Sequence, residues 1–136
     1  MLRNAKGMTL LEIMIVLAIL GGLIGILGNQ VVKRLQSAKI KETKIQIAEL
    51  SKALDMFYTD CGFYPSSEAG LEALVSEASG CNNWGPDPYI PKVKKDPFNC
   101  DFIYEREGSS YIIISLGEGC REGGKGTEAD ISSDNL

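Results

Sequence analysis

The sequence contains no histidine, and its four cysteines form no CxxC pair. A zinc site or a Cys-His nucleophile is therefore not expected, because such sites need imidazoles or closely spaced thiolates. No serine or cysteine stands beside a plausible catalytic base, and little of the chain is left for a folded head. These absences predict a protein that is not an enzyme and has no catalytic residues.

Basic residues are scarce in the second half of the chain. From Lys33 to Asp55 there are six basic and three acidic residues, a net charge of +3. From Met56 to Leu136 there are six basic and fourteen acidic residues, a net charge of −8. Because binding to phosphate groups needs a basic surface, nucleic acid is not expected as a main partner.

One long and largely apolar run extends from Met8 to Leu27, and Glu12 is its single charged residue. As a helix this run reaches about 30 Å, which is the thickness of the hydrocarbon core of a bilayer. We therefore assign residues 8–28 to a membrane helix that also serves in assembly. A carboxylate inside such a helix is a functional hypothesis by default, and it needs a partner.

A short basic leader, with Arg3 and Lys6, precedes this run and ends at Gly7. A secretory signal peptide would be cut after its apolar run, so cleavage between Gly7 and Met8 would be a different kind of processing. The cut would leave a charged amine on Met8, four residues before Glu12 and on the same helix face. That amine can pair with Glu12 of its own chain or of another copy, and pairing between copies would set the stagger of a filament.

The stretch Lys6-Gly7-Met8-Thr9-Leu10-Leu11-Glu12 resembles the processing site of type IV pilins and of the pseudopilins of type II secretion. The resemblance implies that a prepilin peptidase removes residues 1–7 as a leader peptide and that Met8 is then N-methylated. In that family the fifth mature residue is glutamate, which corresponds to Glu12. Met8 replaces the usual phenylalanine and is also apolar.

Beyond the membrane run, apolar residues recur at spacings of three and four, which predicts an amphipathic helix over residues 29–60. Its apolar stripe consists of Ile40, Ile47, Leu50, Leu54 and Phe57. We expect this stripe to pack on a globular head formed by residues 61–136.

Within the head, Ser66-Ser67 predicts a capped short helix that reaches about Ala78. Residues 102–104 and 111–115 are rich in aromatic and β-branched side chains, and they predict an antiparallel hairpin. The block Tyr64–Val75 resembles a segment that separates major pseudopilins from most type IV pilins. The resemblance implies the α+β type IV pilin-like fold, in which a long N-terminal helix packs on a small antiparallel sheet with a short second helix.

The loop Ser115–Ile131 is rich in glycine and contains scattered carboxylates, which are ligands that suit calcium. From chemistry alone a surface loop is favoured over a metal site, because the EF-hand spacing is missing. The resemblance implies a structural calcium here, but Gly119 and Ala129 stand where the family has aspartates. Asp130 and Glu118 remain the candidate ligands, and calcium is the one candidate cofactor.

The cysteines allow three disulfide connectivities. If Tyr104 lies opposite Tyr111 in the hairpin, Cys100 begins one strand beside the end of the other, from which the chain leaves toward Cys120. This geometry favours one connectivity over the other two, with the pairs Cys61–Cys81 and Cys100–Cys120. We hypothesise that the second disulfide takes over the tethering role of calcium in the C-terminal loop.

The resemblance implies a structural subunit of the inner membrane, with a single membrane pass and its head in the periplasm. The subunit would form a helical homopolymer, the pseudopilus, that drives protein export through the outer membrane. Its implied partners are minor pseudopilins, an inner-membrane assembly platform and the prepilin peptidase. A type IV pilin that forms surface pili for adhesion, motility or DNA uptake is the alternative, because it shares the N-terminal pattern.

We expect the mature protein isolated from cells to begin at Met8, because the leader should be removed after Gly7. Intact-mass measurement and N-terminal sequencing would show the loss of residues 1–7 and one methyl group on the new amine. A mature chain that begins at any other residue would contradict the processing hypothesis.

Overall fold

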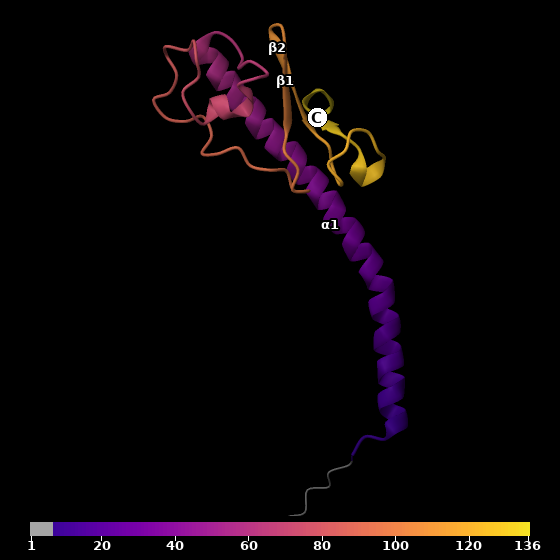
Figure 1. The fold of residues 1–136 in the computed structure, drawn as a ribbon. Helices are drawn as coiled ribbons and strands as arrows, with labels where there is room; N and C mark the ends of the chain where they lie inside the picture. The colour runs from indigo at the N-terminus through magenta and orange to yellow at the C-terminus, as the bar shows by residue number, and fades with distance from the viewer. Residues whose placement is uncertain (1–6) are drawn as a thin grey trace, which may run out of the picture. The chain divides into compact units, whose positions relative to one another are not determined.

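The computed structural model describes residues 7–136, and the chain separates into two compact units, Met1–Gln36 and Ser37–Leu136. We call the second unit the head unit. Helix α1 (Leu10–Cys61) contributes to both units. The other elements belong to the head unit: η1 (Gly70–Leu74), β1 (Ile103–Glu107), β2 (Ser110–Ser115), η2 (Gly126–Glu128), β3 (Ile131–Ser132) and η3 (Ser133–Asn135) (Figure 1). The expected leader residues 1–6 lie outside the described part of the chain.

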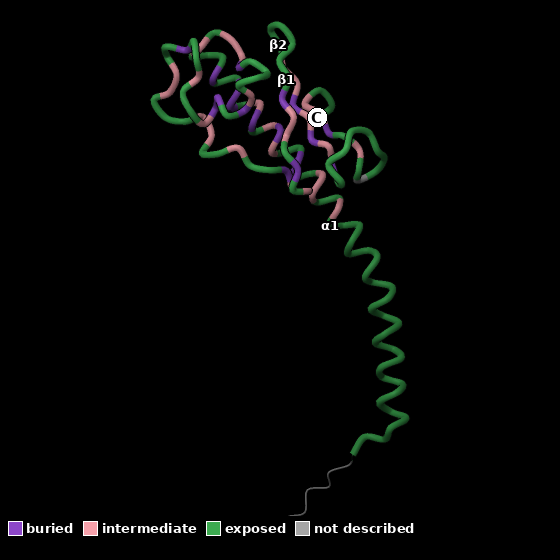
Figure 2. Tube along the Cα trace, viewed as in Figure 1, coloured by how far each residue is buried: buried purple, intermediate pink, exposed green. Residues whose placement is uncertain are grey.

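The N-terminal unit consists of the first part of α1 and presents its side chains to the surroundings. Residues 7–35 are all exposed (Figure 2). By length and composition, α1 contains an apolar window long enough to cross a membrane. The helix is continuous through four glycines, at positions 21, 22, 25 and 28.

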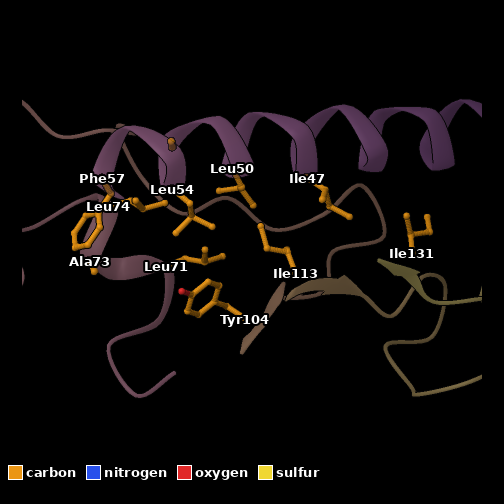
Figure 3. Packing of buried hydrophobic residues seen from close by; sticks show 11 residues of the cluster. Ile47, Leu50, Leu54, Phe57, Leu71, Ala73, Leu74, Tyr104, Ile113 and Ile131 are labelled. Atoms are coloured by element: carbon orange, nitrogen blue, oxygen red, sulfur yellow. The ribbon is translucent and has the colours of Figure 1, made fainter. Parts of the chain in front are cut away.

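The core of the head unit lies under one face of α1. The buried residues of the helix are Thr43, Ile47, Leu50, Ala53, Leu54 and Phe57, which follow the predicted spacing of three and four. Figure 3 shows the side chains of Ile47 and Leu50 directed from α1 toward Ile113 of β2. The stripe predicted from the sequence is therefore confirmed, except that Ile40 is only partly buried at its edge.

The sheet is antiparallel and has the order β1-β2-β3. The expected pairing of Tyr104 with Tyr111 is wrong, because Tyr104 lies opposite Ile113 and Arg106 lies opposite Tyr111. The strands continue to a tight turn in which Gly108 has a φ of 61°, a conformation that glycine adopts at the first position of a two-residue turn. The error is a shift of two residues, so each side chain stays on its expected face.

The predicted short helix is present but is shorter and tighter than expected. It is a 3-10 helix over Gly70–Leu74 and does not reach Ala78. Ser66 caps the preceding turn, because its Oγ accepts a hydrogen bond from the Ala69 N–H at 3.1 Å. Gly70 has a φ of 59°, which an α-helix cannot include, so the turn and the helix cannot merge into one longer α-helix.

The side chains of η1 pack into the core of the head unit. Leu71, Ala73 and Leu74 are buried there. Nearby, the Tyr104 hydroxyl donates a hydrogen bond to the carbonyl oxygen of Pro65 at 2.8 Å. Burial raises the pKa of Tyr104 to about 12, so its hydroxyl stays protonated and keeps donating at neutral pH.

The two isoleucines at positions 45 and 47 of α1 provide a matched test of this packing. Ile47 is fully buried, whereas Ile45 is 59% exposed. We expect Ile47→Ala to lower the free energy of unfolding by about 2 to 5 kcal/mol, because it removes buried methyl groups and leaves a cavity. Ile45→Ala should change it by less than about 0.5 kcal/mol. Denaturant titration of both variants would measure the difference, and equal losses would contradict the assigned core face.

Candidate functional site

The expected cleavage point lies just before the first turn of α1. Residues 7–9 have no regular structure, and the helix begins at Leu10. Thr9 caps it, because the Thr9 Oγ1 accepts a hydrogen bond from the Glu12 N–H at 3.3 Å and the Thr9 carbonyl accepts one from the Ile13 N–H at 3.2 Å. The bond between Gly7 and Met8 therefore lies outside the helical hydrogen bonds, where an extended backbone can enter a peptidase.

Glu12 occupies the third position of the helix after the Thr9 cap, which is the acidic position of a capping box. The pattern threonine-x-x-glutamate was a signal in the sequence for this cap, whereas Glu12 was interpreted there only as an ion-pair partner. Within residues 7–136 no cation lies at ion-pair distance from Glu12 in the single chain.

The first part of α1 exposes a continuous apolar surface. Its large exposed side chains are Met8, Leu10, Leu11, Ile13, Met14, Ile15, Val16, Leu17, Ile19, Leu20, Leu23, Ile24, Ile26 and Leu27. Apolar surface of this extent is unfavourable in water at about 25 cal/mol per Å². Lipid or other copies of the chain must cover it.

The structure joins the cysteines in the two pairs that the sequence analysis favoured. Cys61 at the end of α1 is bonded to Cys81, with the Cα atoms 5.1 Å apart. Cys100 is bonded to Cys120, with the Cα atoms 5.5 Å apart. Both disulfides span 20 residues of sequence.

Asp96 is a buried carboxylate that organises the chain around Cys100, and it is only 4% exposed. Its Oδ1 accepts hydrogen bonds from the backbone N–H groups of Phe98 at 3.0 Å and of Cys100 at 2.8 Å. Its Oδ2 accepts the Ser115 hydroxyl at 2.6 Å. The role of Asp96 was not predicted from the sequence, although an aspartate that opens an Asp-Pro turn commonly bonds the backbone of that turn.

The candidate calcium ligands lie in residues 116–130, which we call the C-terminal loop. Asp130 is exposed, and its Oδ2 accepts a hydrogen bond from the Gly123 N–H at 3.0 Å. Glu118 lines a shallow hollow together with Glu122, Glu128 and the cationic Arg121. Within the described residues, no three acidic, histidine or cysteine side chains are grouped as a metal site would require. This arrangement does not fit a calcium ion.

Two family models match the chain. Residues 2–28 match the prokaryotic N-terminal methylation motif. Residues 30–134 match the model for protein G of the type II secretion system. The chain belongs to the type II secretion system protein G family. The two matches cover the stem helix and the head of this protein G family member.

Several curated relatives have the same family name. The chain is 38% identical to type II secretion system core protein G of Pseudomonas aeruginosa over 136 residues, which covers 96% of each chain. It is 35% identical to core protein G of Vibrio cholerae over 139 residues, which covers 99% of this chain and 95% of the relative. Each alignment therefore covers nearly the full length of this chain and of the relative.

A solved structure gives the same result for the fold. The major pseudopilin of the type 2 secretion system of enterohaemorrhagic Escherichia coli matches with a TM-score of 0.64 and 30% identity, over 81% of this chain and 94% of that one. The predicted type IV pilin-like fold is therefore confirmed, as is the resemblance to major pseudopilins. The alternative of a surface pilin gains no support from these relatives.

The Asp96 carboxylate and the exposed Asp101 carboxylate allow a matched test. We expect Asp96→Ala to lower the free energy of unfolding by roughly 3 kcal/mol or more, because each buried group left without a partner costs about 1–3 kcal/mol. Asp101 is 84% exposed and lies 3.9 Å from Lys95, so Asp101→Ala should cost less than about 1 kcal/mol. Denaturant titration would compare the two, and a small loss for Asp96→Ala would contradict its organising role.

Proposed function

We propose that this chain is a structural subunit that polymerises into the periplasmic pseudopilus of a type II secretion system and drives protein export through the outer membrane. The observation that carries the proposal is the membrane-length apolar helix that begins at Leu10, three residues after Gly7, in a chain whose residues 30–134 match protein G of the type II secretion system. We assign no second function, because no feature of the head favours a surface pilin over a pseudopilin.

Processing converts the chain into a form that can assemble. A prepilin peptidase cleaves between Gly7 and Met8 and N-methylates Met8, and the match to the methylation motif over residues 2–28 supports this step. The new amine lies four residues before Glu12, so both groups face the same side of the helix. A methylated amine keeps its positive charge, and it remains a partner for the carboxylate.

The free chain is held in the inner membrane by residues 8–28, with its head in the periplasm. A carboxylate at the centre of a membrane helix costs about 2.5–3.5 kcal/mol, and Glu12 near the helix end costs less. Pairing with the Met8 amine of an arriving copy removes this cost at one axial offset only. The pair therefore sets the register, while the exposed apolar side chains of α1 supply most of the attraction between copies.

The partners follow from this route. The peptidase acts first, an inner-membrane assembly platform extracts the processed subunits, and minor pseudopilins join the filament beside copies of this chain. The subunit acts by position and not by catalysis, since its four cysteines are joined in disulfides and the buried Asp96 carboxylate is bonded to the backbone around Cys100. Nucleic acid is not a main partner of the acidic head.

We expect Glu12→Ala to leave membrane insertion intact, because removing a charge favours insertion, and to abolish ordered filaments. The assay is electron microscopy and sedimentation of filaments from cells that express the secretion genes, with membrane fractionation to confirm insertion. Normal filaments from Glu12→Ala would refute the pairing.

Glu49 supplies the matched control, since it is an exposed glutamate on the same helix within the head unit. Glu49→Ala removes the same charge at a position that the pairing does not use. Filaments should form as in the unchanged protein, and their loss in both variants would indicate a general effect of charge on α1.

A further inference from the structure

We propose that the C-terminal loop is held closed by the chain itself, through the Cys100–Cys120 disulfide at one end and an Asp130 clasp at the other, and that it needs no calcium. In this assignment the Asp130 carboxylate is a hydrogen-bond acceptor for the backbone and not a metal ligand. The inference concerns the folded head unit and does not rest on the proposed function.

The first attachment is at the start of the loop. Cys100 is 3% exposed, and its N–H donates to the Asp96 carboxylate, which also accepts the Ser115 hydroxyl. The disulfide therefore connects Cys120 to a point that is already fixed within the core. The backbone at Cys120 has a φ of 53°, a left-handed conformation that non-glycine residues adopt only when their surroundings hold them.

The second attachment is near the end of the loop. The Asp130 Oδ2 accepts the Gly123 N–H at 3.0 Å, which closes the residues between them into a ring. Gly124, which belongs to this ring, has a φ of 101° and lies against the backbone of Glu128. A Cβ on Gly124 would come within 2.5 Å of the Glu128 carbonyl oxygen, so only glycine fits this approach.

These two attachments position the end of the loop, from which the chain continues into β3. Immediately after Asp130, Ile131 of β3 is 9% exposed and belongs to the core. The following Ser133 accepts a hydrogen bond from the Ile113 N–H at 3.1 Å. A strand of only two residues has little pairing energy of its own, so its docking depends on where the C-terminal loop ends.

The donor set of the loop is poor for calcium, which needs six to eight oxygen ligands. The Asp130 carboxylate already has a backbone partner in the Gly123 N–H, which its Oδ2 accepts. Position 119 is a glycine, and a glycine supplies no side-chain oxygen as a ligand. Glu118, Glu122 and Glu128 line a hollow that Arg121 also lines, and the positive charge of Arg121 disfavours a cation there.

The two disulfides allow a controlled test, because both span 20 residues and should contribute equally through chain entropy. Limited trypsin digestion of the full chain in detergent would be followed by mass spectrometry at Arg121 and Lys125, the two tryptic sites of the C-terminal loop. We expect Cys100→Ser with Cys120→Ser to accelerate cleavage there by about tenfold or more, because cleavage tracks the open population. Cys61→Ser with Cys81→Ser should leave these two rates within about twofold of the unchanged protein.

Asp130 variants test the clasp while both disulfides remain intact, so they decide the matter even if a cysteine variant fails to fold. Asp130→Asn keeps an acceptor oxygen for the Gly123 N–H, and its cleavage rates should match those of the unchanged protein. Asp130→Ala removes the acceptor and should increase cleavage at Arg121 and Lys125. A metal ligand would behave differently, since both variants would then lose protection.

Calcium is the remaining arm of the test. Cleavage rates and melting temperature of the unchanged protein should be the same with excess calcium chloride as with EGTA, because only a ligand that binds the folded state stabilises it. Protection by calcium, together with its loss in Asp130→Asn, would overturn the proposal in favour of a metal site. Equal acceleration of cleavage by the two disulfide variants would contradict the role of Cys100–Cys120 in holding the loop. Cleavage rates that stay unchanged in Asp130→Ala would contradict the role of the Asp130 hydrogen bond.

Discussion

The burial of one face of α1 under β2 and η1 is the interaction on which the head unit depends. Ile47, Leu54 and Phe57 are fully buried, and Ile113 and Leu74 meet them from the opposite side (Figure 3). This part of the helix needs the partner, because an amphipathic helix in a protein gains most of its stability from tertiary packing of its apolar face. The head in turn has short strands and 3-10 turns that could not form a core without the helix.

Because the core lies between α1 and a small sheet, the rest of the head is held by disulfides and by single hydrogen bonds. Between Val75 and Phe102 the described chain has no helix or strand, and it is held by Cys61–Cys81 and by single contacts such as the Trp84 Nε1 hydrogen bond to the Ala73 carbonyl. The C-terminal loop is held by Cys100–Cys120 and the buried Asp96. In this small head, disulfides and buried hydrogen bonds supply stability that a larger hydrophobic core supplies in larger domains.

Features that depend on residues close in sequence were predicted correctly more often than features that depend on distant residues. The α1 stripe was predicted because a period of 3.6 is a property of neighbouring residues. The hairpin was predicted with a register error of two residues, because the turn at Gly108 was read as longer than it is. The short helix was predicted too long at both ends, and its start was misplaced because the left-handed backbone at Gly70 is not visible in a list of helix-favouring residues.

The candidate sites divide in the same way. The cleavage point after Gly7 and the pairing role of Glu12 were inferred from a contiguous motif, whereas the capping contact from Thr9 to Glu12 was missed although its signal was local. The turn contacts of Asp96 with Phe98 and Cys100 were missed although the Asp-Pro signal was local, whereas its contact with Ser115 could not be seen because that residue is far away in sequence. Asp130 was considered for calcium because its residue type suits the ion, and only its contact with Gly123 indicated another role.

The sequence by itself determined the long apolar run, the helix face that is buried and the protein class, because each depends on residue type and short-range spacing. Only the tertiary structure decided the hairpin register, the hydrogen bonds of Asp96 and the contact that closes the C-terminal loop. The physical reason is that a buried polar group is satisfied by whichever donor the folded chain brings near it, and that donor is chosen by packing across distant segments.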